Sequence, residues 1–151
     1  MIYRTSLSLF FLFLTFSAFS QKVKIKDEIA TVDGEDYLQL KRNRGTEVSI
    51  FELDSTKEVL FARYMSYTDF SLVTRSNPEG KVRWLELKFL TLNLVCEVPS
   101  MSQKGLVKLL HENNIFVDGV LNEDNVQTLI QKYGSTYTNN RPGQVPYTLF
   151  I

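Results

Sequence analysis

The chain has 151 residues with 17 basic and 17 acidic side chains, so its formal net charge is zero. This balance produces no strong positive field and argues against nucleic acid or an anionic membrane surface as a partner. The single cysteine and single histidine nearly exclude a thiolate or imidazole metal site within one chain, because closed zinc sites use about four such ligands.

The N-terminal segment has the pattern of a secretory signal peptide. Arg4 precedes an apolar run over residues 7–16, and the small residues Ala18 and Ser20 stand ahead of a cleavage point at Gln21. The apolar run is about half as long as a bilayer span, so an uncleaved membrane anchor is the less favoured alternative. Cleavage would leave a chain long enough for one domain with one core.

The sequence therefore predicts three parts: a signal peptide over residues 1–20, a single α+β domain over 21–134, and a polar tail over 135–151. We expect the polar part of the tail to be a linker or a mobile segment. Its apolar end, Val145–Ile151, would dock on the domain or serve as a partner-binding peptide. The location would be periplasmic, at the cell surface or secreted, with no integral membrane segment after cleavage.

The first half of the domain has the pattern of antiparallel strands joined by tight turns. Asp33-Gly34 between two strand-like runs is a strong hairpin signal, because both central residues of such a turn need positive φ. Residues 58–67 carry apolar or aromatic side chains on both faces, which indicates a central or covered strand that residues 70–74 continue. The expected strands cover residues 22–26, 28–32, 37–41, 46–53 and 58–67.

The longest strand-like stretch is Lys81–Val98. Leu85, Leu87 and Phe89 occupy odd positions, whereas from Leu90 onward the apolar residues fall mainly on even positions. A straight strand of this length would span roughly 60 Å, far more than a domain of this size accommodates. We therefore expect a bend or bulge near Phe89 and Leu90.

Two short helices follow Pro99, which ends the sheet. Ser100 or Ser102 caps the first helix, and Asn122 caps the second, which Gly134 terminates. The predicted fold is α+β: an antiparallel, strongly curved β-meander of about six or seven strands followed by two short C-terminal helices.

Few residues suggest catalysis or metal binding. Cys96 lies on the apolar parity of its strand, so a buried, inert thiol is favoured over a nucleophile paired with His111. Glu86 and Glu97 are the first acids to inspect for a carboxylate hydrolase, although both fall on the solvent parity. Two groups of oxygen-bearing side chains could hold calcium: Asp33, Glu35 and Asp36, and Asp118, Asn122 and Asp124. Neither group follows the spacing of a calcium loop, and we expect no cofactor.

Aromatic residues provide the candidate interaction surface. Tyr64, Tyr67, Phe70 and Trp84 lie on strands expected to be near neighbours, and exposed rings on a sheet can stack on sugars or grip a peptide. The alternative is that these rings belong to the core. If they are exposed together, they form a larger apolar patch than monomers usually tolerate, which would mark an interface.

Three stretches carry a resemblance: KVKIKDEIATVDGEDYLQL, the strand ending FARY, and HENNIFVDGVLNEDNVQTLIQKYG. Over about Lys22 to Gly134 the chain resembles small exported proteins of Bacteroidetes-type bacteria, whose function is uncharacterised. The resemblance implies an envelope or secreted setting and supplies no catalytic residues.

The favoured hypothesis is an exported, non-catalytic protein that binds another protein or an envelope component. A second hypothesis is a binder of a small apolar ligand, with a cavity lined by Phe61, Met65, Leu87 and Leu92. A third is a small hydrolase that uses two carboxylates.

Overall fold

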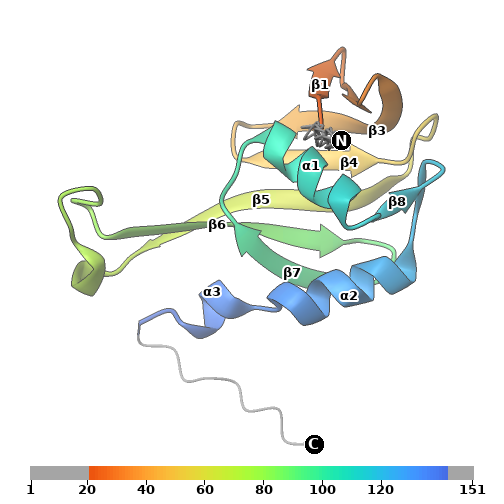
Figure 1. Cartoon of the computed structure of the whole chain (residues 1–151). Coiled ribbons are helices and arrows are strands. Elements are labelled where there is room, and N and C mark those ends of the chain that lie inside the picture. Colours follow the sequence, from red (N-terminus) through yellow and green to blue (C-terminus); the bar gives the residue numbers. More distant parts are fainter. Residues whose placement is uncertain (1–20, 143–151) are drawn as a thin grey trace, which may run out of the picture.

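The computed structural model describes residues 21–142, which form a seven-stranded antiparallel sheet with helices packed against it (Figure 1). The predicted signal peptide and the segment Val145–Ile151 lie outside the described residues. The strands of the sheet are β1 (Val23–Lys26), β2 (Ile29–Val32), β3 (Glu35–Asn43), β4 (Glu47–Phe51), β5 (Glu58–Thr68), β6 (Lys81–Phe89) and β7 (Leu94–Pro99). The remaining elements are the 3-10 helix η1 (Phe70–Leu72), α1 (Gln103–Glu112), the two-stranded β8 (Phe116–Val117) and β9 (Val120–Leu121), α2 (Glu123–Tyr133) and α3 (Thr136–Asn139).

Each strand of the sheet pairs with the next one in the sequence, in the order β1 to β7. This confirms the predicted α+β meander, and strong curvature stays a prediction. Register shifts occur between Ala30 and Thr31 and between Ile50 and Phe51. At the second shift Ile50 pairs with Leu60 and Phe51 with Glu58, so the extra residue, Val59, lies in β5.

The stretch Lys81–Val98 contains a turn between two strands, where we expected one bent strand. β6 ends at Phe89 and β7 begins at Leu94, and the two pair antiparallel with Phe89 opposite Leu94. The connection ends at Asn93, whose φ of 52° lies in the left-handed region that asparagine tolerates better than most residues. The change of parity at Leu90 therefore marks a hairpin turn, and the stretch folds back on itself as two paired strands.

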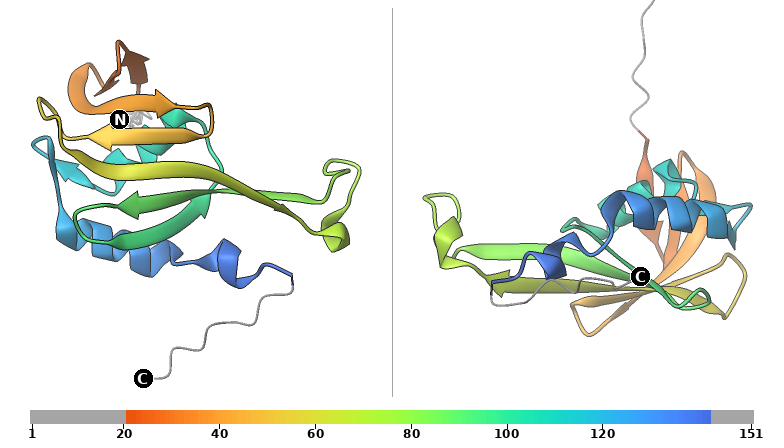
Figure 2. Two further views of the ribbon diagram at one scale, coloured as in Figure 1. Left: turned by 180° about the vertical axis from the view of Figure 1, so that it is seen from behind. Right: turned by 90° about the horizontal axis from the view of Figure 1, so that it is seen from below.

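The core lies between one face of the sheet and the helices α1 and α2 (Figure 2). Alternate residues of the strands point into it, as the period of two requires. The core-facing residues of the sheet include Leu38, Leu40, Val48, Ile50, Leu60, Ala62, Leu85, Leu87, Phe89, Cys96 and Val98. Leu106, Val107, Leu110, Val126 and Leu129 cover them from the helices.

The helix ends follow the capping signals of the sequence. The Ser102 hydroxyl accepts a hydrogen bond from the Gly105 N–H, which selects Ser102 over Ser100 as the cap of α1. The Asn122 side chain caps α2 by accepting from the Asn125 N–H. Gly134 ends α2 with a φ of 55°, as predicted.

Candidate functional site: the tip of the β5–β6 hairpin

The β5–β6 hairpin projects from the body of the molecule (Figures 1 and 2). Its strands pair without interruption from Leu60 opposite Phe89 to Thr68 opposite Lys81. We call residues 69–80, which connect the two strands, the hairpin tip. The expected extension of β5 over residues 70–74 is wrong, because the chain turns there into the 3-10 helix η1.

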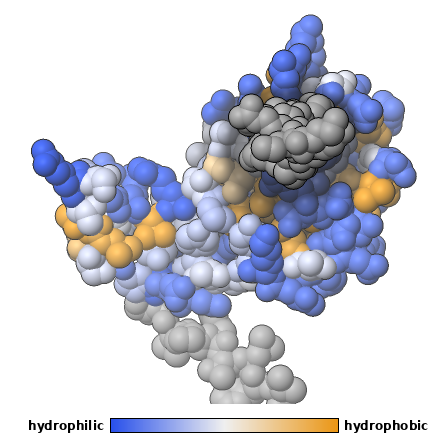
Figure 3. All heavy atoms as spheres, viewed as in Figure 1, coloured by the Kyte–Doolittle hydropathy of each residue, from blue (hydrophilic) through white to orange (hydrophobic). Residues whose placement is uncertain are grey.

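The hairpin tip exposes three apolar side chains within four residues. Phe70 is 83% exposed, Leu72 46% and Val73 47%. In the view of Figure 3 apolar surface lies on this projecting part, with more polar surface between it and the apolar surface of the body. Single exposed apolar residues are common on proteins, but a cluster on a projecting element is typical of an interaction site.

Asp69 organises the start of the hairpin tip. Its carboxylate accepts hydrogen bonds from the Ser71 N–H at 2.9 Å and the Ser71 hydroxyl at 2.6 Å, which caps η1. The Ser71 hydroxyl and then its backbone N–H lower the pKa of Asp69, so the carboxylate stays ionised below its usual range. The Asp69 N–H also donates to the Gly80 carbonyl at 2.8 Å and closes the loop.

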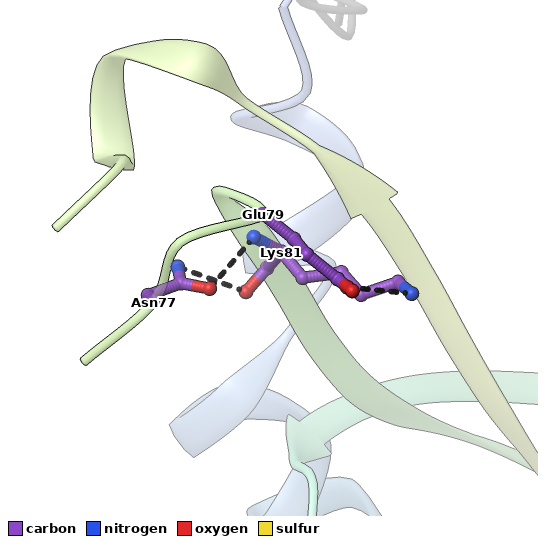
Figure 4. Close-up of polar contacts among 3 residues, drawn as sticks. All are labelled: Asn77, Glu79 and Lys81. Carbon is purple, nitrogen blue, oxygen red and sulfur yellow. Dashed lines mark hydrogen bonds and ion pairs between the residues drawn. The ribbon is translucent and has the colours of Figure 1, made fainter. Parts of the chain in front are cut away.

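Asn77 holds the end of the hairpin tip (Figure 4). Its Oδ1 accepts from the Lys81 N–H at 2.9 Å, and its Nδ2 donates to the Lys81 and Leu72 carbonyls at 3.3 and 3.4 Å. Thr74 and Asn77 exchange two backbone hydrogen bonds of 3.1 Å. One side chain thus links the η1 end of the tip to the first residue of β6.

An ion pair and a glycine complete the connection. The Lys81 ammonium lies 3.1 Å from the Glu79 carboxylate, and this hydrogen bond and charge lower the pKa of Glu79 (Figure 4). Gly80 has a φ of 59°, and a Cβ at this position would overlap the Asp69 carbonyl oxygen. The conformation therefore requires glycine, and the apolar side chains of the tip are displayed by an ordered loop.

The structure places the four candidate aromatic residues in different surroundings. Tyr64 pairs with Leu85 on the core side of the sheet and donates its hydroxyl to the Met101 carbonyl at 2.9 Å. Phe70 lies at the hairpin tip. Tyr67 and Trp84 belong to the opposite face of the sheet, where Trp84 is only 1% exposed. The four residues do not form one patch, and Phe70 alone is strongly exposed.

Residues 135–141, which we expected to be a linker or a mobile segment, contain α3 and pack against the sheet. Tyr137 stacks on Trp84, and the Tyr137 N–H donates to the Glu97 carboxylate at 2.7 Å. Glu97 is on the face opposite the core, as its parity predicts, but it is 2% exposed because α3 covers it. Sequence reasoning missed this contact, since no local pattern shows where α3 crosses the sheet.

The predicted interior cavity has no counterpart at the residues we expected. Leu87 points into the core, whereas Phe61 and Met65 lie on the opposite face. The structure instead has an open groove of about 700 Å³ between the sheet and the start of α1. Its lining includes Arg42, Lys104 and Ser102, all exposed, so it lacks the apolar enclosure that the ligand hypothesis requires.

The remaining chemical candidates are buried, covered or packed against other side chains. Cys96 is fully buried in the core, as predicted, and burial together with the nearby Glu97 charge raises the pKa of its thiol to about 12. His111 lies against Tyr37, with ring centroids 5.0 Å apart. Glu86 and Glu97 face each other across β6 and β7, but α3 occupies the space in front of Glu97.

Two further observations concern residues 21–142. No group of three or more His, Cys, Asp or Glu side chains in this part of the chain is arranged to hold a metal ion. None of its helices has the length and apolarity needed to cross a bilayer.

Comparison with known protein families, with curated proteins and with solved structures gave no match to this chain.

Proposed function

We propose that this protein is an exported, non-catalytic binding protein, and that the hairpin tip inserts Phe70, Leu72 and Val73 into a pocket of a protein partner. The observation that carries the proposal is the 83% exposure of Phe70 on a projecting loop held by its own hydrogen bonds. A phenylalanine this exposed contributes little to the stability of the isolated domain, whereas its burial in the pocket of a partner would contribute to binding.

The ordered loop supports tight binding by three side chains. Association costs conformational freedom, and a loop already fixed by Asp69 and Asn77 loses less of it than a flexible loop would. Burying a phenylalanine and two aliphatic side chains contributes about 1.5–3 kcal/mol for each fully buried side chain.

The charges of the hairpin favour a protein over a membrane. Between Asp69 and Lys81 two acidic residues, Asp69 and Glu79, balance two basic residues, Arg75 and Lys81. Membrane-inserting loops usually combine apolar side chains with an excess of Lys and Arg that attracts anionic lipids. The hairpin tip has the apolar side chains but no excess of Lys and Arg.

A photo-crosslinking residue at position 70 tests the proposal. The full chain carrying p-benzoylphenylalanine in place of Phe70 is expressed in the source cells and irradiated, with Val120 replaced in a matched control. Val120 is also an exposed apolar residue, 58% exposed, but it lies on β9 outside the hairpin.

We expect a discrete protein adduct from position 70 and none from position 120. Only lipid adducts, no adduct, or the same adducts from both positions would refute partner binding by the hairpin tip. Fractionation of the same cells tests export, because an intact N-terminus found only in the cytoplasm would contradict it.

A further inference from the structure

A second site lies at the base of the same hairpin, beneath the C-terminal segment, by which we mean residues 135–141. The Tyr137 ring lies parallel to the indole of Trp84, with an interplanar angle of 2° and centroids 5.7 Å apart. Tyr67 meets the indole at 62°, also at 5.7 Å, and the Arg141 guanidinium lies 5.7 Å above the Tyr67 ring. Side chains from a segment distant in sequence thus pack on the aromatic residues of β5 and β6.

Glu97 is the polar anchor of this contact. Its carboxylate accepts hydrogen bonds from the Tyr137 N–H at 2.7 Å, the Thr138 N–H at 2.9 Å and the Thr138 hydroxyl. Ser135, at the N-cap of α3, makes no side-chain capping bond. Glu97 therefore supplies, from β7, the negative charge and the acceptors that the first turn of a helix requires.

The helix α3 depends on these contacts. A helix of four residues is unstable alone, because nucleation costs more than so few hydrogen bonds return. None of its residues is buried, and it follows Gly134, where the chain leaves α2. The segment is thus bound to the sheet mainly by one aromatic ring and one hydroxyl-bearing residue.

The C-terminal segment places a ring on Trp84 but offers its indole N–H no acceptor among the described residues. The Trp84 Nε1 is buried and has no hydrogen-bond partner within residues 21–142. Buried donors are rarely left unpaired, since an unpaired donor costs about 1–3 kcal/mol. A ligand that placed a carbonyl or hydroxyl oxygen beside the indole would satisfy it.

We propose that Trp84 and Glu97 form a peptide-binding site that residues 135–141 occupy in cis. Its ligand in trans is a peptide of another protein in which an aromatic residue is followed by serine or threonine. The aromatic ring replaces Tyr137 on Trp84, and two successive backbone N–H groups and the hydroxyl replace those of Tyr137 and Thr138 on Glu97. This site is independent of the hairpin tip, so either proposal can fail alone.

Competition within the chain explains how the site would be regulated. A tethered segment acts at an effective concentration of about 1 mM, so a free peptide displaces it only when it binds more tightly or is locally concentrated. Weakening the tethered segment should therefore reveal the site to an added peptide.

The test uses the fluorescence of Trp84, the only tryptophan of the chain. In the full chain with Tyr137→Ala, we expect the emission to shift to longer wavelength as water reaches the indole. Adding the peptide STYTNNR, the sequence of residues 135–141, up to about 10 mM should restore the wild-type spectrum, because this exceeds the effective concentration roughly tenfold. The peptide STATNNR is the matched control and should have no effect.

Two variants keep the test decisive. Thr138→Val weakens the Glu97 contact while keeping Tyr137, and it replaces Tyr137→Ala if that variant does not fold. Adding Glu97→Gln to either variant should abolish restoration by STYTNNR. The proposal is overturned if STYTNNR restores nothing at 10 mM (about ten times the effective concentration), if STATNNR acts equally well, or if wild-type chains exchange their segments and form dimers as concentration rises.

Discussion

Substituting Gly80 by alanine should disorder the hairpin tip without unfolding the domain. Alanine at a φ of 59° costs about 1–2 kcal/mol, and its Cβ would overlap the Asp69 carbonyl oxygen. The overlap can be relieved only by moving the backbone, which breaks the hydrogen bond from the Asp69 N–H to the Gly80 carbonyl and costs about 1 kcal/mol more. We expect the ordered tip to lose about 2–3 kcal/mol relative to its open state.

Hydrogen exchange measures this loss at single amides. The Asp69 and Lys81 N–H groups, both bonded within the tip, should exchange about 30–150 times faster in Gly80→Ala, since about 1.4 kcal/mol corresponds to a factor of ten. Crosslinking from position 70 should fall in parallel, whereas the amides of β6 beyond the tip keep their protection.

Gly34→Ala is the matched control. Gly34 has a positive φ of 98° in the turn between β2 and β3, but a Cβ there meets no atom within 4 Å. It should leave the hairpin tip unchanged. Unaltered exchange of Asp69 and Lys81 in Gly80→Ala, or equally fast exchange in Gly34→Ala, would show that the tip is not held as described.

Four further outcomes test the architecture. Phe70→Ser should change the free energy of unfolding by less than about 0.5 kcal/mol in urea titrations, since an exposed ring supports no core. It should nevertheless abolish crosslinking of the partner from p-benzoylphenylalanine placed at position 72 of the hairpin tip instead of position 70. Leu85→Ala should cost about 2–5 kcal/mol because Leu85 is fully buried, while Val95→Ala on the exposed face of β7 stays within about 0.5 kcal/mol. Cys96 should resist thiol reagents at pH 8 until the protein unfolds. The pKa of the Cys96 thiol is about 12 in the folded protein and about 8.5 in the unfolded chain. The thiol's contribution to stability is therefore complete below about pH 8.5 and declines as the pH rises toward 12. A wild-type protein with the same alkaline stability profile as Cys96→Ala would contradict this. Glu97→Gln should shift the Trp84 emission to longer wavelength and lower the free energy of unfolding by about 1–3 kcal/mol. The loss stays within this range because α3 can detach from the sheet. An unchanged spectrum would show that the carboxylate does not hold the segment.

Local patterns predicted the sheet because each strand carries its own alternation. The hairpin at Asp33-Gly34 and the caps Ser102 and Asn122 depend on residues a few positions apart, so they could be identified in the sequence. The turn between β6 and β7 has neither glycine nor proline. Its signal was the change of parity at Leu90 together with Asn93, the residue that adopts positive φ.

The candidate site was harder to predict. Phe70 to Thr74 has a strand-like composition, and only the placement of Asp69 two residues before Ser71 indicates the capped 3-10 helix. The burial of Trp84 and Glu97 depends on contacts with Tyr137, which lies 53 positions after Trp84 (137 − 84) and 40 after Glu97, and no periodicity encodes such contacts. The sequence therefore singled out Phe70 and Trp84 together with Tyr64 and Tyr67, but it showed neither which of them is exposed nor that Tyr137 stacks on Trp84.

The end of α2 also has a consequence for solubility. β7 is an edge of the sheet, and the N–H of Glu97 on that edge donates to the Gly134 carbonyl at 2.8 Å. An open edge is a template for pairing with a strand of another molecule, and covering it with a helix end is one way to prevent aggregation. At the other edge, β1 carries the exposed Lys24 and Lys26, whose charges oppose the same pairing. Loss of the Gly134 contact would therefore leave β7 open to polymerisation while the core stays intact.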